Sequence, residues 1–393
     1  MKKTIIIILC MILALSAIAG CSKSTKKDTK EAPAEDKAED KAEEKTEGKA
    51  EEKTEGKAED KTDEKVEDGA DDLPVLRLGM FGTRNSFVTW YMIENGIDIE
   101  NGFKIEPTVT TSGGSFLNEA VGAGKVDATH MGAAQAVYSA SVYDCKVIAE
   151  FSDGAGSSAI FGRPDSEEAQ VIGDNPDFPE VRGSAETLKG KTFMYPSGSM
   201  SQLTVAKYLE VFGLTLDDIT SLNTNYGPGY QALQAGEGDT VTIFSPLTLT
   251  ALHDGYVQLA SLDQLGVSVR DCLMVTPEAY ENPETMDTIK KYVKVLFEYS
   301  DKFLEDPEWQ LEELKKLHEY YGTIVPDPDK LSIEVEKHYL LSTEQAMDSL
   351  DDLGKSALTI GQFYYEIGLI EEDALERIEN NVDKSIMEEL FGD

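Results

Sequence analysis

The composition of the chain changes abruptly at Leu73, and this change limits where a fold can form. Residues 22–72 contain almost no apolar residue larger than alanine, and an octad, Lys-Ala-Glu-Glu-Lys-Thr-Glu-Gly, starts at Lys41 and again at Lys49. Glu–Lys pairs four residues apart favour a helix only by a few tenths of a kcal/mol, and each glycine costs about 1 kcal/mol. We therefore predict a solvated, disordered segment before Leu73 and a globular part over 73–393.

The N-terminus has the three parts of an export signal. Lys2 and Lys3 precede an apolar run over 5–18, and small residues follow up to Cys21. About 14 apolar residues rise about 21 Å as a helix, which is short of the roughly 30 Å hydrocarbon core of a bilayer. We predict that 1–20 is a cleaved signal peptide and not a membrane span.

The residues before Cys21 resemble the bacterial lipobox, in which a branched residue and two small ones precede a cysteine that becomes lipidated. The matching stretch is Leu15-Ser16-Ala17-Ile18-Ala19-Gly20-Cys21. The resemblance implies that Cys21 carries acyl chains such as palmitate, and two chains anchor a protein stably. We expect the charged segment 21–72 to tether the globular part to the outer, extracytoplasmic face of a bacterial cytoplasmic membrane.

The net charge of −38 is concentrated in the globular part. Residues 22–72 contain 12 lysines and 20 acidic residues, and the signal peptide contains two lysines, so 73–393 keep 22 basic and 54 acidic residues, a net of −32. This balance leaves no basic patch for nucleic acid or for an anionic lipid surface. A cationic solute is one ligand that it would suit.

Strand, loop and helix patterns alternate from Leu73 onward, which predicts an α/β fold with a parallel or mixed sheet covered by helices. The predicted strands cover 73–79, 104–109, 126–130, 146–151, 191–195 and 240–244, and the predicted helices cover 86–95, 115–122, 200–212 and 229–234. Beyond Glu284 the pattern is mostly helical. About 320 residues exceed a comfortable single core, so we expect two lobes, with the proline-containing segment 163–186 as a surface excursion between them.

A series of motifs in the globular part resembles those of solute-binding proteins for nitrate, taurine, aliphatic sulfonates and thiamine-precursor pyrimidines. The stretch Phe116–Asp127 is similar to their Glu-Ala-x-x-x-Gly-x-x-Asp signature, and Leu188–Ser199 is similar to the start of their second lobe. Tyr230–Asp239, Phe244-Ser245-Pro246, Phe363–Leu369 and Val382-Asp383 follow in the family's order. The resemblance covers nearly all of 74–393.

This resemblance implies a two-lobed periplasmic binding protein type II fold with a helical C-terminal portion. Lobe 1 would comprise 74–162 and 266–393, and lobe 2 would comprise 185–262. The resemblance also implies a monomer that captures a small molecule for an ABC importer, with permease subunits as partners and with no cofactor or metal. An exported sensor or adhesion lipoprotein, or an enzyme on the same fold, are the alternatives.

We expect no enzymatic activity from the motifs present. The chain contains no Gly-x-Ser-x-Gly, His-Glu-x-x-His or Cys-x-x-Cys sequence, and its four histidines are widely dispersed. A pair of catalytic carboxylates stays open, because acidic residues are abundant everywhere.

Two Gly/Ser-rich loops precede predicted helices, and their exposed amides predict a site for an anionic head. The first loop contains Ser112, Gly113, Gly114 and Ser115, with Ser115 as a candidate helix cap, and the second contains Ser197, Gly198 and Ser199. The glycines permit close backbone approach. Plain helix capping is the alternative explanation for each loop.

Further candidate ligand contacts lie at other strand ends. They are Thr83, Arg84 and Asn85 after the first strand, Gly132 and Ala133 after the third, and Tyr226, Phe244 and Ser245 in lobe 2. Arg84, the only arginine expected near the cleft, can pair with an anion, although an exposed loop arginine fits equally well. A polar aromatic ring stacked on Tyr226 or Phe244 fits as well as an anion. We interpret His130 as a strand residue and Trp90 as a core residue.

The globular part contains two cysteines, Cys145 and Cys272, because Cys10 leaves with the signal peptide. An extracytoplasmic location permits a disulfide between them. Two buried thiols, each behaving as a small apolar residue, are the equal alternative.

Overall fold

The computed structural model describes residues 72–110, 114–337 and 339–392. The signal peptide, Cys21, the tether up to residue 71, and the loop residues Ser112 and Gly113 lie outside the described residues. In the part of the chain that is described, no helix is long and apolar enough to cross a bilayer.

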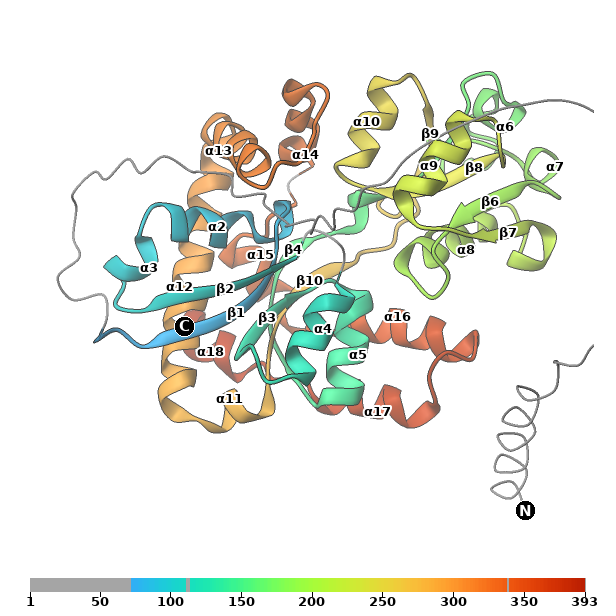
Figure 1. Ribbon diagram of the computed structural model, residues 1–393. Coiled ribbons are helices and arrows are strands. Elements are labelled where there is room, and N and C mark those ends of the chain that lie inside the picture. Colours follow the sequence, from blue (N-terminus) through green and yellow to red (C-terminus); the bar gives the residue numbers. More distant parts are fainter. Residues whose placement is uncertain (1–71, 111–113, 338, 393) are drawn as a thin grey trace, which may run out of the picture. The chain divides into compact units, whose positions relative to one another are not determined.

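The first sheet has the strand order β2-β1-β3-β10-β4 (Figure 1). Its strands are β1 (Val75–Phe81), β2 (Lys104–Thr110), β3 (Ala128–Met131), β4 (Lys146–Asp153) and β10 (Arg270–Val275). β1 pairs in parallel with β2 and β3, whereas β10 lies antiparallel between β3 and β4. Four of these strands agree with predicted ones, but β10 was not predicted, and it joins the sheet from a point far along the chain.

Both faces of the first sheet are buried, and alternate residues of β10 show this. Leu273 and Val275 belong to the apolar cluster that contains α12 (Pro283–Glu305), while Cys272 and Met274 belong to the cluster that contains α5 (Ala133–Tyr143). Since successive strand residues point to opposite faces, these two helices cover opposite sides of the sheet. α4 (Ser115–Gly122) lies beside α5, and α16 (Lys355–Glu366) and α17 (Glu372–Asn380) pack against α5.

The long helix α12 shows how the sequence specifies these elements. Asn282 caps it, because its side chain accepts hydrogen bonds from the amides of Glu284 and Thr285, and Pro283 occupies the first helical position. Its buried residues recur at helical spacing, for example Ile289, Val293, Leu296 and Phe297. The remaining helices of this lobe are α2 (Phe87–Glu94), α3 (Ile97–Glu100), α11 (Pro277–Glu281), α13 (Pro307–Tyr320), α14 (Ser332–Glu336), α15 (Thr343–Asp348) and α18 (Ser385–Phe391).

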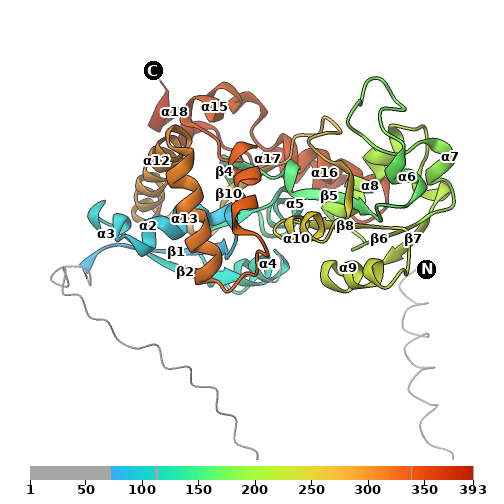
Figure 2. The same ribbon diagram turned by 90° about the horizontal axis from the view of Figure 1, so that it is seen from above.

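The second sheet has the strand order β7-β6-β8-β5-β9, and Figure 2 labels its strands β5, β6, β7 and β8. Its strands are β5 (Ser158–Gly162), β6 (Thr192–Tyr195), β7 (Thr220–Asn223), β8 (Thr240–Phe244) and β9 (Val257–Ser261), and its helices are α6 (Glu167–Gln170), α7 (Ala185–Leu188), α8 (Met200–Glu210), α9 (Tyr226–Gln234) and α10 (Leu247–His253). β6 is parallel to β7 and β8, and β5 is antiparallel to β8 and β9. The second sheet has its own two apolar clusters.

The chain passes between the sheets twice, and the two passages run beside each other. The first passage follows β4 through a 3-10 turn, Ala155–Ser157, and the second joins β9 to β10. The amide of Gly154 donates to the carbonyl of Val269 at 2.7 Å, which ties the two passages together. Lobe 1 therefore ends before Ser158, earlier than the predicted boundary at 162, because β5 pairs within the second sheet.

Two further expectations need correction. The segment 163–186 is not an excursion between lobes, because Ala169 and Val181 are buried in the core of the second sheet. The helix α9 begins at Tyr226 and not at Gly229. Gly227 and Pro228 argue against a helix in the sequence, yet a proline in the first helical turn loses no hydrogen bond, since the amides there have no intrahelical partner.

Candidate ligand-binding site

A cavity of about 400 Å³ lies where loops from both sheets meet. Its wall is formed by Phe81, Thr83, Arg84, Asn85, Thr110, Gly114, Gly132, Ala134, Gln135, Gly154, Ser157 and Asp271 from the first sheet and the passage beside it, by Ser199, Met200, Tyr226, Phe244, Ser245, Pro246, Leu247 and Thr250 from the second, and by Ile324. Loops after parallel strands gather at one edge of a sheet, which explains why segments so distant in sequence converge here.

The loop after β1 is held against β3 by the hydroxyl of Ser86. This oxygen accepts a hydrogen bond from the amide of Phe81 at 3.0 Å and lies 2.8 Å from Nδ1 of His130. The other ring nitrogen of His130 lies 2.6 Å from the hydroxyl of Tyr292. Burial lowers the pKa of His130 to about 3, so the ring is neutral, and it acts as a structural residue of β3.

Arg84 is buried in the wall of the cavity and is 7% exposed. Its guanidinium donates a hydrogen bond to the hydroxyl of Ser157 and lies 4.6 Å from the ring centroid of Tyr339. Arg84 is therefore not an exposed loop residue. Among the described residues it is the only arginine in the wall of this cavity, and Arg270 lines a neighbouring cavity together with Arg84.

Two buried carboxyl groups lie near Arg84, and the sequence analysis identified neither. Asp271 in β10 accepts hydrogen bonds on one oxygen from the side chain of Asn85 and, at 2.7 Å, from the hydroxyl of Ser152. Burial raises the pKa of Asp271 to about 6, although Arg84 acts against this rise. Glu334 of α14 accepts a hydrogen bond from Ser245, and burial also raises its pKa.

The second sheet contributes the aromatic part of the wall. The rings of Tyr226 and Phe244 lie 5.4 Å apart between centroids and are tilted by 47°. Met200, at the start of α8, and Leu247, at the start of α10, extend this surface. A flat apolar body can pack here, while its polar head would meet the first sheet.

The glycines of the first lobe make room for a protein side chain that the sequence analysis overlooked. A Cβ atom on Gly114 would lie 2.2 Å from Cγ of Gln135, and one on Gly132 would lie 2.9 Å from its Oε1. Gln135 lies in the first turn of α5 and lines the cavity. Gly114, and not Ser115, is the cap residue of α4, and no side chain caps this helix.

In the second-lobe loop over 196–199, some backbone amides donate hydrogen bonds to other groups of the protein. The amide of Ser197 donates to Asn223 at 2.9 Å, and the amide of Gly198 donates to Gln202 at 2.7 Å. The hydroxyl of Ser199 donates to the carbonyl of Pro196 at 2.6 Å and does not cap α8. These amides are therefore less available to an anion than the sequence predicted.

The predicted ligand contacts divide into three groups. Thr83, Arg84, Asn85, Gly114, Gly132, Ser199, Tyr226, Phe244 and Ser245 line the cavity, whereas Ser115, Ala133, Ser197 and Gly198 are not part of its wall, and Ser112 and Gly113 lie outside the described residues. Asp271 could have been found from the run Arg270–Val275, where two charged residues precede four apolar ones, a pattern that fits a buried strand.

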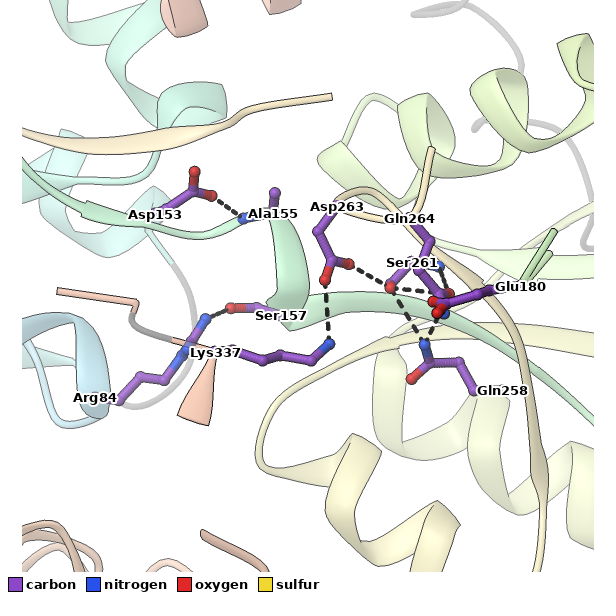
Figure 3. Close-up of polar contacts among 10 residues, drawn as sticks. All are labelled: Arg84, Asp153, Ala155, Ser157, Glu180, Gln258, Ser261, Asp263, Gln264 and Lys337. Carbon is purple, nitrogen blue, oxygen red and sulfur yellow. Dashed lines mark hydrogen bonds and ion pairs between the residues drawn. The ribbon is translucent and has the colours of Figure 1, made fainter. Parts of the chain in front are cut away.

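A second cavity, of about 690 Å³, lies beside the passages between the sheets. It shares Arg84 with the first cavity, and five of its fourteen other lining residues are charged, namely Asp153, Asp263, Arg270, Lys337 and Asp348. Figure 3 shows Lys337 extended toward Asp263, and their charged atoms lie 3.2 Å apart. Asp263 also accepts a hydrogen bond from Ser261 (Figure 3). This ion pair joins the segment after α14 to the passage after β9.

The two cysteines are free and buried, so the disulfide is not formed. Burial raises the pKa of Cys145 to about 12 and that of Cys272 well above its usual range. Both side chains pack in the cluster around α5, as small apolar residues do. In the described ranges, no group of three His, Cys, Asp or Glu residues could hold a metal ion.

No family model matches the chain, but one curated relative covers most of it. A protein of Brachyspira hyodysenteriae, named as an ABC transporter periplasmic binding protein, is 32% identical over 316 residues, which cover 80% of this chain and 89% of that protein.

Solved structures with the same fold are far less similar in sequence. The alkanesulfonate-binding protein SsuA from Xanthomonas axonopodis pv. citri, bound to MOPS, is 18% identical with a TM-score of 0.58, covering 79% of this chain and 98% of that one. The periplasmic nitrate-binding protein NrtA from Synechocystis PCC 6803 is 13% identical with a TM-score of 0.58, covering 81% and 88%. These structures confirm the predicted fold class, and the Brachyspira relative supplies the family. The chain belongs to the periplasmic solute-binding proteins of ABC transporters.

Proposed function

We propose that the cavity of about 400 Å³ holds the solute that this protein passes to an ABC permease. The observation that supports this proposal is the composition of the wall, since both sheets contribute polar and apolar side chains to one cavity. A solute bound there contacts both lobes, so it stabilises the arrangement in which the lobes are together. Closure of the lobes is then the state that the permease recognises.

The larger cavity is a weaker candidate for the solute. Its charged side chains are largely paired with protein groups, because Lys337 faces Asp263 and Arg270 lies 3.8 Å from Glu150. The smaller cavity combines aromatic walls with a few convergent polar groups, which is the usual composition of a small-molecule site.

A test of the cavity uses mass spectrometry of the purified full-length chain under non-denaturing conditions. The wild type should carry a copurified small molecule, and Phe244→Ala should lose it. Tyr256→Ala is the matched control, because Tyr256 packs on Tyr230 in the same lobe and does not line the cavity. An equal load on the wild type and on Phe244→Ala would remove the cavity as the site.

We further propose that binding leaves the solute chemically unchanged. The molecule released by denaturation should have the same mass and fragmentation before and after long incubation with fresh protein. A product in this assay would favour an enzyme instead.

The membrane anchor is proposed at Cys21, with the globular part acting as a monomer outside the cytoplasm. The export signal and the small residues before Cys21 support this proposal. A Cys21→Ala chain should bind its solute normally and be recovered in the soluble fraction, while the parent chain sediments with membranes. Equal sedimentation of the two chains would argue against the anchor.

A further inference from the structure

Asp271 presents an unused acceptor to the ligand cavity. The residue is 4% exposed, and one carboxylate oxygen, Oδ2, accepts the hydrogen bonds from Asn85 and Ser152. The other oxygen, Oδ1, has no hydrogen-bond partner among the described residues. It lies under two glycines of the cavity wall, because a Cβ atom on Gly132 or on Gly154 would be 3.4 Å from it. A ligand donor can therefore reach an acceptor that the protein leaves open.

The charges around Asp271 favour a cation over an anion at this end. Arg84 is the one cationic side chain in the wall of this cavity, as far as the chain is described, and its charge acts on two buried carboxyl groups. Its charge lowers the pKa of both Asp271 and Glu334 against the effect of burial. Asp153 adds a further negative charge near Asp271. An anionic head would compete with the carboxyl groups of Asp271 and Glu334 for the charge of Arg84.

The rest of the cavity fits the same interpretation. The aromatic rings of Tyr226 and Phe244 attract a cation or a flat, electron-poor ring through their faces. The amides of Ser197 and Gly198, which could otherwise hold an anion, donate to protein side chains.

We propose that Asp271 determines specificity by pairing with a protonated nitrogen head, such as an amidinium or a protonated amine, on a ligand whose flat apolar body packs against Tyr226 and Phe244. This proposal rests on the proposed function and deepens it. It assigns the site a cationic ligand, in contrast to the alkanesulfonate and nitrate named for the structural neighbours.

Isothermal titration of the full-length chain with three probes of one size tests the charge. After dialysis to remove copurified molecules, benzamidine (cationic), benzamide (neutral) and benzenesulfonate (anionic) are titrated at pH 7.5. Benzamidine should bind the wild type most tightly, and Asp271→Asn should weaken it by about 30-fold, the usual effect of removing one member of a buried charge pair. The affinity for benzamide should change by less than about 3-fold, because its shape and amide donors still fit.

Two controls separate failure of this inference from failure of the cavity assignment. Asp263→Asn removes an acidic charge from the other cavity and should change the three affinities alike, by about 2-fold or less, because only the exposed pair with Lys337 is lost. Phe244→Ala should weaken every probe that binds. If Phe244→Ala weakens benzamidine and Asp271→Asn does not, the charge inference is wrong and the cavity stands. If neither variant changes its affinity, the cavity assignment fails as well.

Three other results would also overturn the inference. They are tighter binding of benzenesulfonate than of benzamidine, equal loss of benzamidine and benzamide in Asp271→Asn, and no binding of benzamidine to the wild type. Thermal unfolding of Asp271→Asn, followed by circular dichroism, establishes that the variant is folded in each case.

Discussion

The two sheets face the same cavity with different chemistry. The first sheet contributes Arg84, Asn85, Gln135 and Asp271, all able to form hydrogen bonds or ion pairs, whereas the second contributes mainly rings and aliphatic chains around Phe244. This difference in lining suits two different kinds of ligand contact, one for each lobe. Under the proposed function, the first lobe contacts the polar head of the solute and the second lobe covers its apolar body. A lobe that only covers the ligand can move away without leaving a buried charge unpaired.

The strongest test of this comparison is Arg84→Ala. Removing the guanidinium takes away its hydrogen bond to Ser157 and the positive charge that acts on the buried carboxyls Asp271 and Glu334, which should cost about 3 kcal/mol. Urea unfolding of the ligand-free chain measures this loss. Thr83→Ala alters the preceding residue of the same loop and should cost less than about 0.5 kcal/mol. A loss below about 1 kcal/mol in Arg84→Ala would show that the first lobe does not depend on this charge.

Asp271→Asn should raise the stability of the ligand-free chain at neutral pH. The pKa of Asp271 lies at about 6 in the fold against an ordinary 3.8, so the charged form is disfavoured by about 3 kcal/mol above pH 6. This penalty disappears as the pH falls from 6 toward 3.8. The stability advantage of Asp271→Asn, measured by urea unfolding, should therefore be largest at pH 7 and vanish near pH 4. An advantage that is the same at both pH values would contradict the buried, charged state.

The sequence predicts four of the five strands of the first sheet and misses β10, the strand that contains Asp271. Alternating apolar residues identify β1 and β2, and the ordered motifs identify the family, because both are local patterns. Asp271 meets Asn85 across 186 positions of sequence, through a strand that returns antiparallel after a whole lobe. No local pattern reports such a pairing. The start of α9 at Tyr226 was missed for another reason, because Gly227 and Pro228 are residues that usually disfavour a helix.

The second lobe's role as a cover is tested by Tyr226→Ala. Tyr226 is partly buried and packs on Phe244, so its loss should weaken benzamidine binding by about 10-fold, in line with about 1.4 kcal/mol for a lost aromatic contact. Titration at pH 7.5 measures this change. The ratio of benzamidine to benzamide affinity should stay constant, because the head contacts lie on the other lobe. A changed ratio would show that Tyr226 takes part in recognising the charged head of benzamidine.

The smallest predicted effect concerns the ion pair between Lys337 and Asp263, which joins the two lobes beside the cavity and not through it (Figure 3). Both side chains are 38% exposed, so water screens the pair, and its contribution is about 0.5 kcal/mol or less. Burial alone would raise the pKa of Asp263, but hydrogen bonds from Ser261 and the charge of Lys337 outweigh it and lower the pKa.

Lys337→Ala should therefore weaken benzamidine binding about 2-fold at low salt, since the pair favours the arrangement in which the lobes are together. The difference should shrink at 0.5 M salt, where screening is stronger. A double-mutant cycle with Asp263→Ala isolates the pair, because the second substitution should add nothing once Lys337 is gone. A loss of 10-fold or more that is insensitive to salt would mean that this contact, and not the ligand, holds the lobes together. Closure could then not be explained by a first lobe that contacts the head of the ligand and a second lobe that covers its body.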